Sequence, residues 1–99
     1  MFFDWDEKKS SKLKRNPKRA FSFEEVSEIF SKPHFVDQRN DDPEQYFAIG
    51  WVKNVLVTVV FEYRIFYLEE EESEMEGVHL VTYWRSTKEE RSLYEENQK

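Results

Sequence analysis

One stretch decides the fold: residues 46–68, which read YFAIGWVKNVLVTVVFEYRIFYL. β-Branched and aromatic side chains dominate this stretch, and such side chains are typical of strands. Lys53-Asn54 divides it into Tyr46–Val52 and Val55–Leu68. A two-residue link of this kind favours a tight hairpin turn, because Asn54 tolerates a positive φ. The stretch therefore predicts two antiparallel strands.

The sequence after these strands predicts a second hairpin and a helix. Glu69–Gly77 contains six glutamates, so we expect it to be a solvent-exposed loop. Val78–Trp84 predicts the last strand. Thr87 and Glu90 then have the spacing of a capping box, which indicates a terminal helix from Lys88 to about Asn97.

Two helices are predicted before the central strands. Asp4 and Glu7 are spaced as a capping box, so a helix is expected from Trp5 to about Lys14, and Asn16-Pro17 ends it. Ser22-Phe23-Glu24-Glu25 is a second capping box. Apolar residues with helical spacing follow, and this helix stops at Ser31-Lys32, before Pro33.

A short extended segment connects these helices to the central strands. His34–Asp37 predicts a short strand, in which His34 has a structural role, and Asn40–Pro43 predicts a turn. The expected fold is therefore α+β: two N-terminal helices packed on a four-stranded antiparallel sheet, followed by a C-terminal helix. We expect the helices to cover one face of the sheet. The length indicates a single domain over residues 1–99.

Composition excludes several classes of site. The chain has no cysteine and two histidines, so we expect no disulfide, no metal site and no cofactor. No apolar run approaches the roughly 20 residues that span a bilayer, and acidic residues near Met1 differ from the basic start of a signal peptide. These features predict a cytoplasmic protein with no membrane partner.

The charge is unevenly distributed. The formal net charge is −6, yet Lys8–Arg19 holds seven positive charges and no negative one. Such a patch can bind phosphate or an acidic partner, or it can be a solvated helix face. Both interpretations remain open.

Motifs spread along the chain resemble one known family. Phe3-Asp4-Trp5-Asp6 with Lys9 resembles the opening of BrnT-type toxins, as does the segment from Ser22 to Phe30. Further similar motifs follow in the family order: Asp37, Arg39 and Glu44; Ala48-Ile49-Gly50; Val59–Arg64; and Arg85–Arg91 with Tyr94.

This resemblance implies a RelE-like fold and metal-independent cleavage of RNA. It also implies that the chain is the toxin of a type II toxin–antitoxin pair. The expected partners are the RNA substrate and a cognate ribbon-helix-helix antitoxin, with which the chain forms a hetero-oligomer.

Cleavage without a metal needs a base for the 2′-hydroxyl, an acid for the leaving oxygen and cations for the phosphorane. Arg64 and Arg85 are the candidate phosphate-binding cations, although each could be an ordinary strand-end residue. Glu44 is a candidate base, or simply part of a polar turn. His79, Tyr83 and Arg85 would share one side of the last strand, where His79 could act as acid or base.

The RNA backbone would be held by the basic segment and by one phenol. The predicted RNA-binding residues are Lys9, Lys12, Lys14, Arg15, Lys18, Arg19 and Tyr83. The cleavage hypothesis depends on Arg64 and Arg85 meeting at one phosphate-sized hollow. Their placement far apart on opposite surfaces would remove that basis.

A second hypothesis is an interaction module of the same fold that binds an antitoxin without cleaving RNA. Departures from the family favour it: Asn16-Pro17-Lys18 stands where the family has Lys-His-Gly, and Tyr46 and Trp84 each stand where the family has an arginine. The retained Arg64, Arg85 and Glu44 favour the cleavage hypothesis. A nucleic-acid binder that uses the basic helix alone is a third, weaker alternative, because the chain as a whole is acidic.

Overall fold

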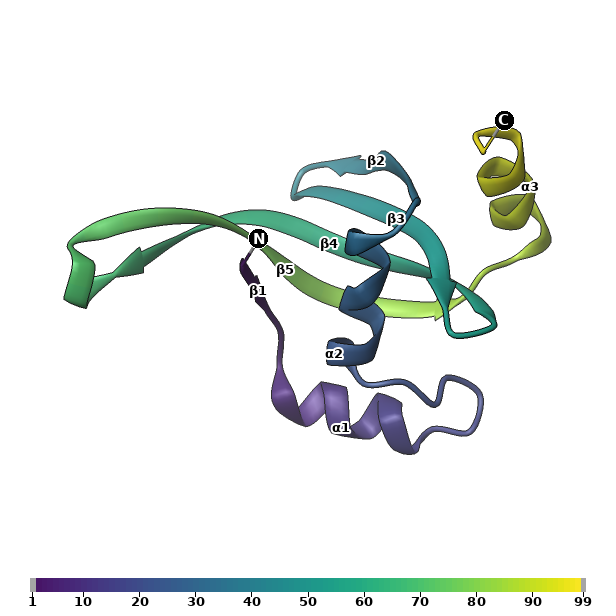
Figure 1. The fold of residues 1–99 in the computed structure, drawn as a ribbon, viewed down its shortest axis with the longest axis horizontal. Coiled ribbons are helices and arrows are strands. Elements are labelled where there is room, and N and C mark those ends of the chain that lie inside the picture. Colours follow the sequence, from purple (N-terminus) through teal and green to yellow (C-terminus); the bar gives the residue numbers. More distant parts are fainter. Residues whose placement is uncertain (1, 99) are drawn as a thin grey trace.

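The computed structural model describes residues 2–98 and has an α+β fold built on one five-stranded sheet. Its elements are β1 (Phe2–Asp4), α1 (Glu7–Arg15), α2 (Phe23–Val26), a 3-10 helix η1 (Ser27–Ser31), β2 (Phe35–Asp41), β3 (Glu44–Val52), β4 (Val55–Leu68), a 3-10 turn η2 (Glu69–Glu71), β5 (Ser73–Arg85) and α3 (Lys88–Glu96). Figure 1 shows β4 and β5 as the longest strands, crossing the whole molecule. No helix within residues 2–98 is both long and apolar enough to cross a bilayer.

The sheet has the strand order β1-β5-β4-β3-β2 and is mixed. β1 runs parallel to β5, whereas every other pairing is antiparallel. The expectation of four antiparallel strands was therefore incomplete. β1 was missed because three residues are too few to show a strand pattern, and its pairing with β5 spans some 75 positions of chain.

The first helix begins later than expected. Its N-cap is Asp6, whose side chain accepts hydrogen bonds from the backbone amides of Lys8 and Lys9. Asp4 belongs instead to β1, so the proposed Asp4–Glu7 capping box is wrong. The capping boxes at Ser22–Glu25 and Thr87–Glu90 are both confirmed. The helix after Ser22 is short and tightens into the 3-10 helix η1.

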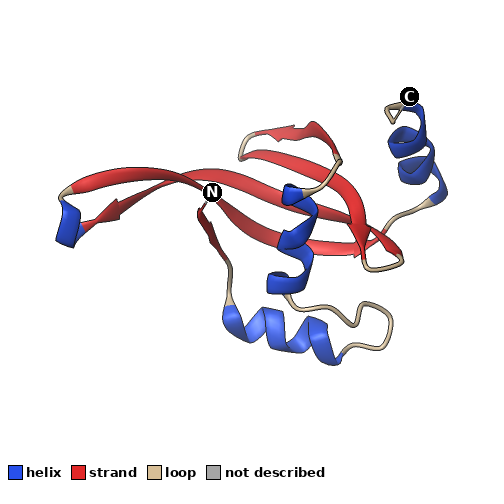
Figure 2. Ribbon diagram, in the orientation of Figure 1, coloured by secondary structure: helices blue, strands red, loops and turns tan. Residues whose placement is uncertain are grey.

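Helices cover both faces of the sheet, not one. We call the side that carries α2 and η1 the α2 face; its core includes Phe23, Val26 and Ile29 against Val59 and Phe61. α1 lies outside α2, and its buried Ser10 hydroxyl accepts a hydrogen bond from the Phe23 amide at 2.8 Å. Figure 2 shows α1 and α2 on one side of the strands and α3 beyond their far end.

The opposite side is the α3 face, where Tyr94 of α3 packs with Ile49 and Leu56. Glu90 fixes the start of this helix to the sheet. Its carboxylate accepts hydrogen bonds from Thr58 Oγ1 at 3.0 Å and from Trp84 Nε1 at 3.0 Å. α3 covers this face only near β3, the beginning of β4 and the end of β5, so part of the face stays open.

Two connections differ from their predicted form. β2 continues to Asp41, so the predicted turn at Asn40–Pro43 is shorter than expected. The predicted loop Glu69–Gly77 is mostly strand, because β5 already begins at Ser73. The Lys53-Asn54 turn is confirmed, but Lys53 rather than Asn54 has the positive φ, at 56°.

Candidate functional site

The α3 face carries a polar cluster where α3 does not cover it. We define this cluster as Glu62, Arg64, His79, Asp4 and Gln45, which come from four strands. Glu62 and His79 are register partners on β4 and β5, and Asp4 of β1 is the register partner of His79. Directly opposed residues point to the same side of a sheet, so three neighbouring strands bring these side chains together.

Glu62 lies at the centre of this cluster. Its Oε1 accepts a hydrogen bond from Arg64 Nη2 at 2.8 Å, and its Oε2 accepts one from Gln45 Nε2 at 2.8 Å. The Gln45 hydrogen bond, followed by the Arg64 guanidinium, holds the pKa of Glu62 below its usual value. Glu62 is therefore an ionised carboxylate at neutral pH, half-buried beside a cation.

His79 is held from the other side. Its Nδ1 lies 2.5 Å from Asp4 Oδ1, and its side chain is largely buried. This contact leaves Nε2 as the nitrogen available to a ligand. The cluster thus offers a carboxylate that can accept a proton, an imidazole whose Nε2 faces a ligand, and a guanidinium that can bind a phosphate oxygen.

A hollow adjoins this face between the sheet and α3. It has a volume of about 240 Å³ and is lined by Arg39, Phe47, Thr58, Trp84, Glu90 and Leu93. The Arg39 guanidinium lies over the Trp84 ring, 5.8 Å from its centroid. Arg39 Nη1 also lies 3.4 Å from Gln45 Oε1, which joins the hollow to the polar cluster. The guanidinium thus occupies a face of the Trp84 ring in a cation–π contact.

Arg64 and Arg85 do not meet, and the expectation that they form one phosphate site is wrong. Arg64 pairs with Gly77, whereas Arg85 pairs with Val57. Seven positions of β4 separate the two, or roughly 23 Å along the strand. An odd separation also places them on opposite faces. On the α2 face, Arg85 Nε donates to the Lys18 carbonyl at 2.8 Å.

A β-bulge explains why His79 and Tyr83 also lie on opposite faces. Val60 pairs with Thr82 and Phe61 with Leu80, so Val81 is an extra residue on β5. The extra residue reverses the alternation of side chains beyond it. His79 remains on the α3 face while Tyr83 turns into the core of the α2 face.

Tyr83 cannot contact RNA, and its prediction as an RNA-binding residue is wrong. It is fully buried. Its hydroxyl donates to the Phe21 carbonyl at 2.7 Å and accepts from the Phe21 amide at 2.9 Å. Burial raises the pKa of Tyr83, so the phenol stays protonated. Its role is to fix the loop before α2 to the sheet.

Glu44 lies at the first position of β3, outside the polar cluster. It accepts a hydrogen bond from the Tyr46 hydroxyl at 2.7 Å, which raises the pKa of Tyr46. Its side chain is exposed beside the turn, which agrees with the alternative that Glu44 is part of a polar turn. Within residues 2–98, no hydrogen bond or ion pair joins the Glu44 side chain to the other predicted catalytic residues.

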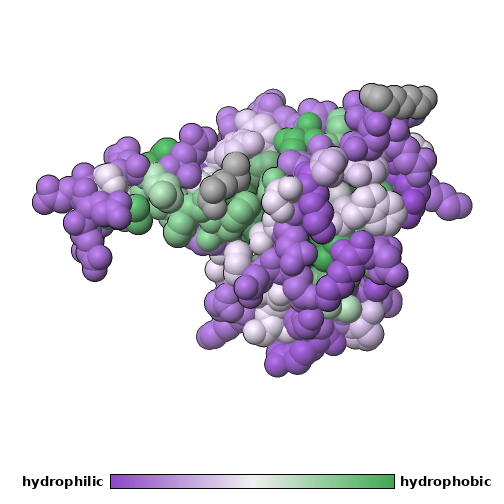
Figure 3. All heavy atoms as spheres, viewed as in Figure 1, coloured by the Kyte–Doolittle hydropathy of each residue, from purple (hydrophilic) through white to green (hydrophobic). Residues whose placement is uncertain are grey.

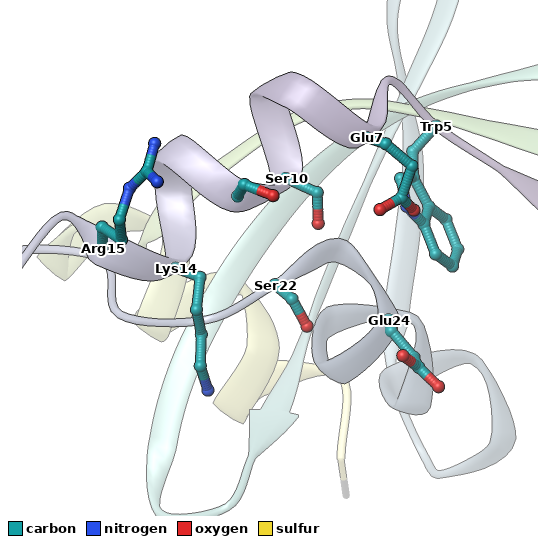
Figure 4. Close-up of a pocket in the computed structure, with 8 residues that line it drawn as sticks. Trp5, Glu7, Ser10, Lys14, Arg15, Ser22 and Glu24 are labelled. Atoms are coloured by element: carbon teal, nitrogen blue, oxygen red, sulfur yellow. The ribbon is translucent and has the colours of Figure 1, made fainter.

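The basic residues predicted to bind RNA lie on the side of the α2 face, not on the α3 face that carries the polar cluster. Those up to Arg15 belong to α1, and Lys18 and Arg19 follow in the loop after it. Lys14 forms an ion pair with Glu25 at 2.6 Å. A hollow of about 320 Å³ lies between α1 and α2. Figure 4 shows that Lys14 extends beside Ser22 there, while Arg15 points away. Glu7 and Glu24 also line it, so its charge is mixed.

The prediction from sequence missed Glu62, Asp4 and Gln45. Glu62 had a usable signal, because it stands two residues before Arg64 in a strand and so shares its face. Asp4 and Gln45 had none, because their contacts depend on strand pairing. No group of three or more histidine, aspartate or glutamate side chains within residues 2–98 is arranged to hold a metal ion.

Comparison with models of known protein families, with curated protein sequences and with solved structures gives no match to this chain. The resemblance to BrnT-type toxins therefore depends on the motifs in the sequence alone.

Proposed function

We propose that this chain is the toxin of a type II toxin–antitoxin pair, a RelE-like, metal-independent endoribonuclease of the cytoplasm, and that Glu62, Arg64 and His79 carry its chemistry. The observation that supports this proposal is their position on one open sheet face, on neighbouring strands. Arg85 and Glu44 have no part in it. The cognate ribbon-helix-helix antitoxin would inhibit the toxin by forming a hetero-oligomer with it.

The proposed reaction is attack of a ribose 2′-hydroxyl on the adjacent phosphate. Glu62, which is ionised at neutral pH, accepts the proton of that hydroxyl, and its lowered pKa makes it a weaker base than a free glutamate. The new P–O bond forms as the bond to the 5′-oxygen breaks, and protonated His79 gives its proton to that leaving oxygen. Arg64 binds the equatorial oxygens of the phosphorane, and its charge compensates theirs. The products are a 2′,3′-cyclic phosphate and a free 5′-hydroxyl.

Incubation of the purified chain with unstructured RNA in EDTA tests this proposal. We expect 2′,3′-cyclic phosphate ends. Arg64→Ala should slow cleavage about 10²–10³-fold, and Glu62→Gln or His79→Gln about 10²–10⁴-fold. Arg85→Ala is the matched control, because the same change on the opposite face should leave the rate within about twofold. Equal losses in Arg64→Ala and Arg85→Ala would contradict the assignment.

The second candidate is a module of the same kind that binds an antitoxin without cleaving RNA. The distribution of charge favours it. In the polar cluster, the carboxylates of Asp4 and Glu62 lie within hydrogen-bond distance of His79 and Arg64, so a phosphate gains little net attraction there. The seven positive charges of Lys8–Arg19 lie in the layer of the α2 face.

Intact RNA in the same assay would favour this second candidate. It then predicts tight binding to the product of an adjacent reading frame, a ribbon-helix-helix protein of roughly 80–100 residues. Co-expression of the two chains and co-purification in a defined ratio would support it. RNA that stays intact, together with the absence of any complex, would contradict both candidates.

A further inference from the structure

The hairpin of β4 and β5 projects beyond the rest of the sheet. Within residues 2–98, β3 pairs with β4 only as far as Phe61, and β1 meets β5 only at Gly77 to His79. We call residues 63–77 the arm. Figure 1 shows it as a two-stranded extension that leaves the body of the molecule beside β1. For most of their length, neither of its edges pairs with a third strand of the part of the chain that the structure describes.

An apolar row lies exposed on one side of the arm. Tyr63, Ile65 and Tyr67 alternate along β4, so all three point to the α2 face. Their exposed fractions are 47%, 64% and 62%. Of the seven large hydrophobic side chains exposed within residues 2–98, four belong to the arm. Apolar side chains gathered in this way mark an interaction surface.

A row of carboxylates runs beside the apolar row. Ile65 pairs with Glu76 and Tyr67 pairs with Glu74, so these glutamates share the same side. The turn adds Glu69–Glu72. None of these six carboxylates forms an ion pair with another part of the chain described by the structure. Their negative charge is therefore uncompensated.

The other side of the arm is anchored to the body. Phe66 packs on Phe2 with ring centroids 4.7 Å apart. Gly77 lets these elements approach, since a Cβ there would lie 2.7 Å from the Phe66 ring and 2.8 Å from the Phe2 carbonyl. The apolar row is consequently held outward, and a hollow of about 320 Å³ lined by Tyr63, Glu76, Gly77 and Val78 lies at its base.

Figure 3 shows hydrophobic atoms along the arm between the body and a hydrophilic tip. An apolar row and an acidic row on adjacent strands lie about 5 Å apart. A cationic amphipathic helix complements these two rows, because it presents an apolar stripe flanked by basic side chains.

We propose that the arm docks a cationic amphipathic helix of a partner protein. The apolar stripe of that helix packs on Tyr63, Ile65 and Tyr67, and its lysine or arginine side chains pair with Glu74, Glu76 and the glutamates of the turn. RNA is excluded as the occupant because six unpaired carboxylates repel a phosphate backbone. This inference is independent of the cleavage chemistry.

Binding of a synthetic helical peptide tests the docking surface. The probe is a Leu/Lys peptide with leucines at helical spacing, and its counterpart has glutamate in place of each lysine. We expect the cationic peptide, and not its glutamate counterpart, to bind the full chain. This binding should weaken as the salt concentration rises from 50 to 500 mM. Ile65→Ser/Tyr67→Ser and Glu74→Lys/Glu76→Lys should each weaken binding at least about tenfold.

Matched variants on α3 provide the control. Leu93→Ser removes an exposed apolar side chain and Glu89→Lys reverses an exposed charge, and both should bind like the parent chain. Circular dichroism checks that every variant is folded. Failure of the peptide to bind, or equal losses in the arm and α3 variants, would overturn the proposal. Self-association of the chain that disappears in the arm variants would assign the surface to a second copy and also overturn it.

Discussion

Neutralising Glu25 should remove a pH-dependent part of the stability of the fold. Glu25 connects three elements: Oε1 lies 2.6 Å from Lys14 Nζ of α1, and Oε2 lies 3.0 Å from Lys53 Nζ of the β3–β4 turn. Oε1 also accepts a hydrogen bond from the Ser22 amide in the capping box. The Lys14 hydrogen bond is the main cause that lowers the pKa of Glu25 from 4.5 to about 2.

The magnitude follows from this difference in pKa. The pKa of Glu25 differs by about 2.5 between the folded and the unfolded chain, and by linkage this difference corresponds to about 3 kcal/mol of folding stability. Both lysines are more than half exposed, so solvent screening reduces the contribution to about 1–2 kcal/mol. Because the folded-state pKa of Glu25 is depressed, this stability is present above about pH 4.5. It is lost as the pH falls through the folded pKa of about 2.

Urea unfolding followed by tryptophan fluorescence measures this effect. At pH 7 Glu25→Gln should unfold with a free energy about 1–2 kcal/mol lower than the parent chain, and the difference should shrink toward zero near pH 2. Glu24→Gln is the matched control, since its exposed side chain has no ion pair within residues 2–98. A difference that stays constant with pH, or an equal loss in Glu24→Gln, would refute the reasoning.

Three further changes test the packing. Tyr83→Phe leaves the buried amide and carbonyl of Phe21 without hydrogen-bond partners, so the free energy of unfolding in urea should fall by about 2–4 kcal/mol. A loss below about 1 kcal/mol would contradict the role of the Tyr83 hydroxyl in holding Phe21. Gly77→Ala should separate β1 from the arm and lower the free energy of unfolding by about 1–3 kcal/mol. The β5 amides near Gly77 should then exchange hydrogen faster, and unchanged exchange would contradict the close packing at Gly77. Glu90→Gln should loosen α3 and shift Trp84 fluorescence, at a cost of about 1–2 kcal/mol, whereas Glu89→Gln should do neither.

Local patterns were sufficient for most elements. β4 occupies Val55–Leu68, as its run rich in β-branched and aromatic residues predicts, and α3 begins directly after Thr87, the N-cap of the capping box with Glu90. These signals are local, because a cap or a strand pattern involves residues close in sequence. The glutamate-rich segment misled the prediction, since charge alone does not distinguish an exposed loop from the end of an exposed hairpin.

The candidate site was less predictable. Arg64 and His79 lie on one open face, but Arg85 and Tyr83 turned to the other. One extra residue in β5 causes this reversal, and nothing in the run Leu80-Val81-Thr82 indicates where a bulge will form. The family motifs and the strand alternation therefore singled out residues without identifying the faces on which these residues lie.

The sequence by itself determined the α+β class, the central hairpin, two of the helix caps and the basic and acidic segments. These follow from side-chain preferences over a few residues. The tertiary structure alone decided that β1 joins β5, that Glu62 and Asp4 meet His79, and that Arg64 is separated from Arg85. The physical reason is that strand register and bulges depend on how the whole sheet buries its two faces, and each shift of one residue reverses every side chain beyond it.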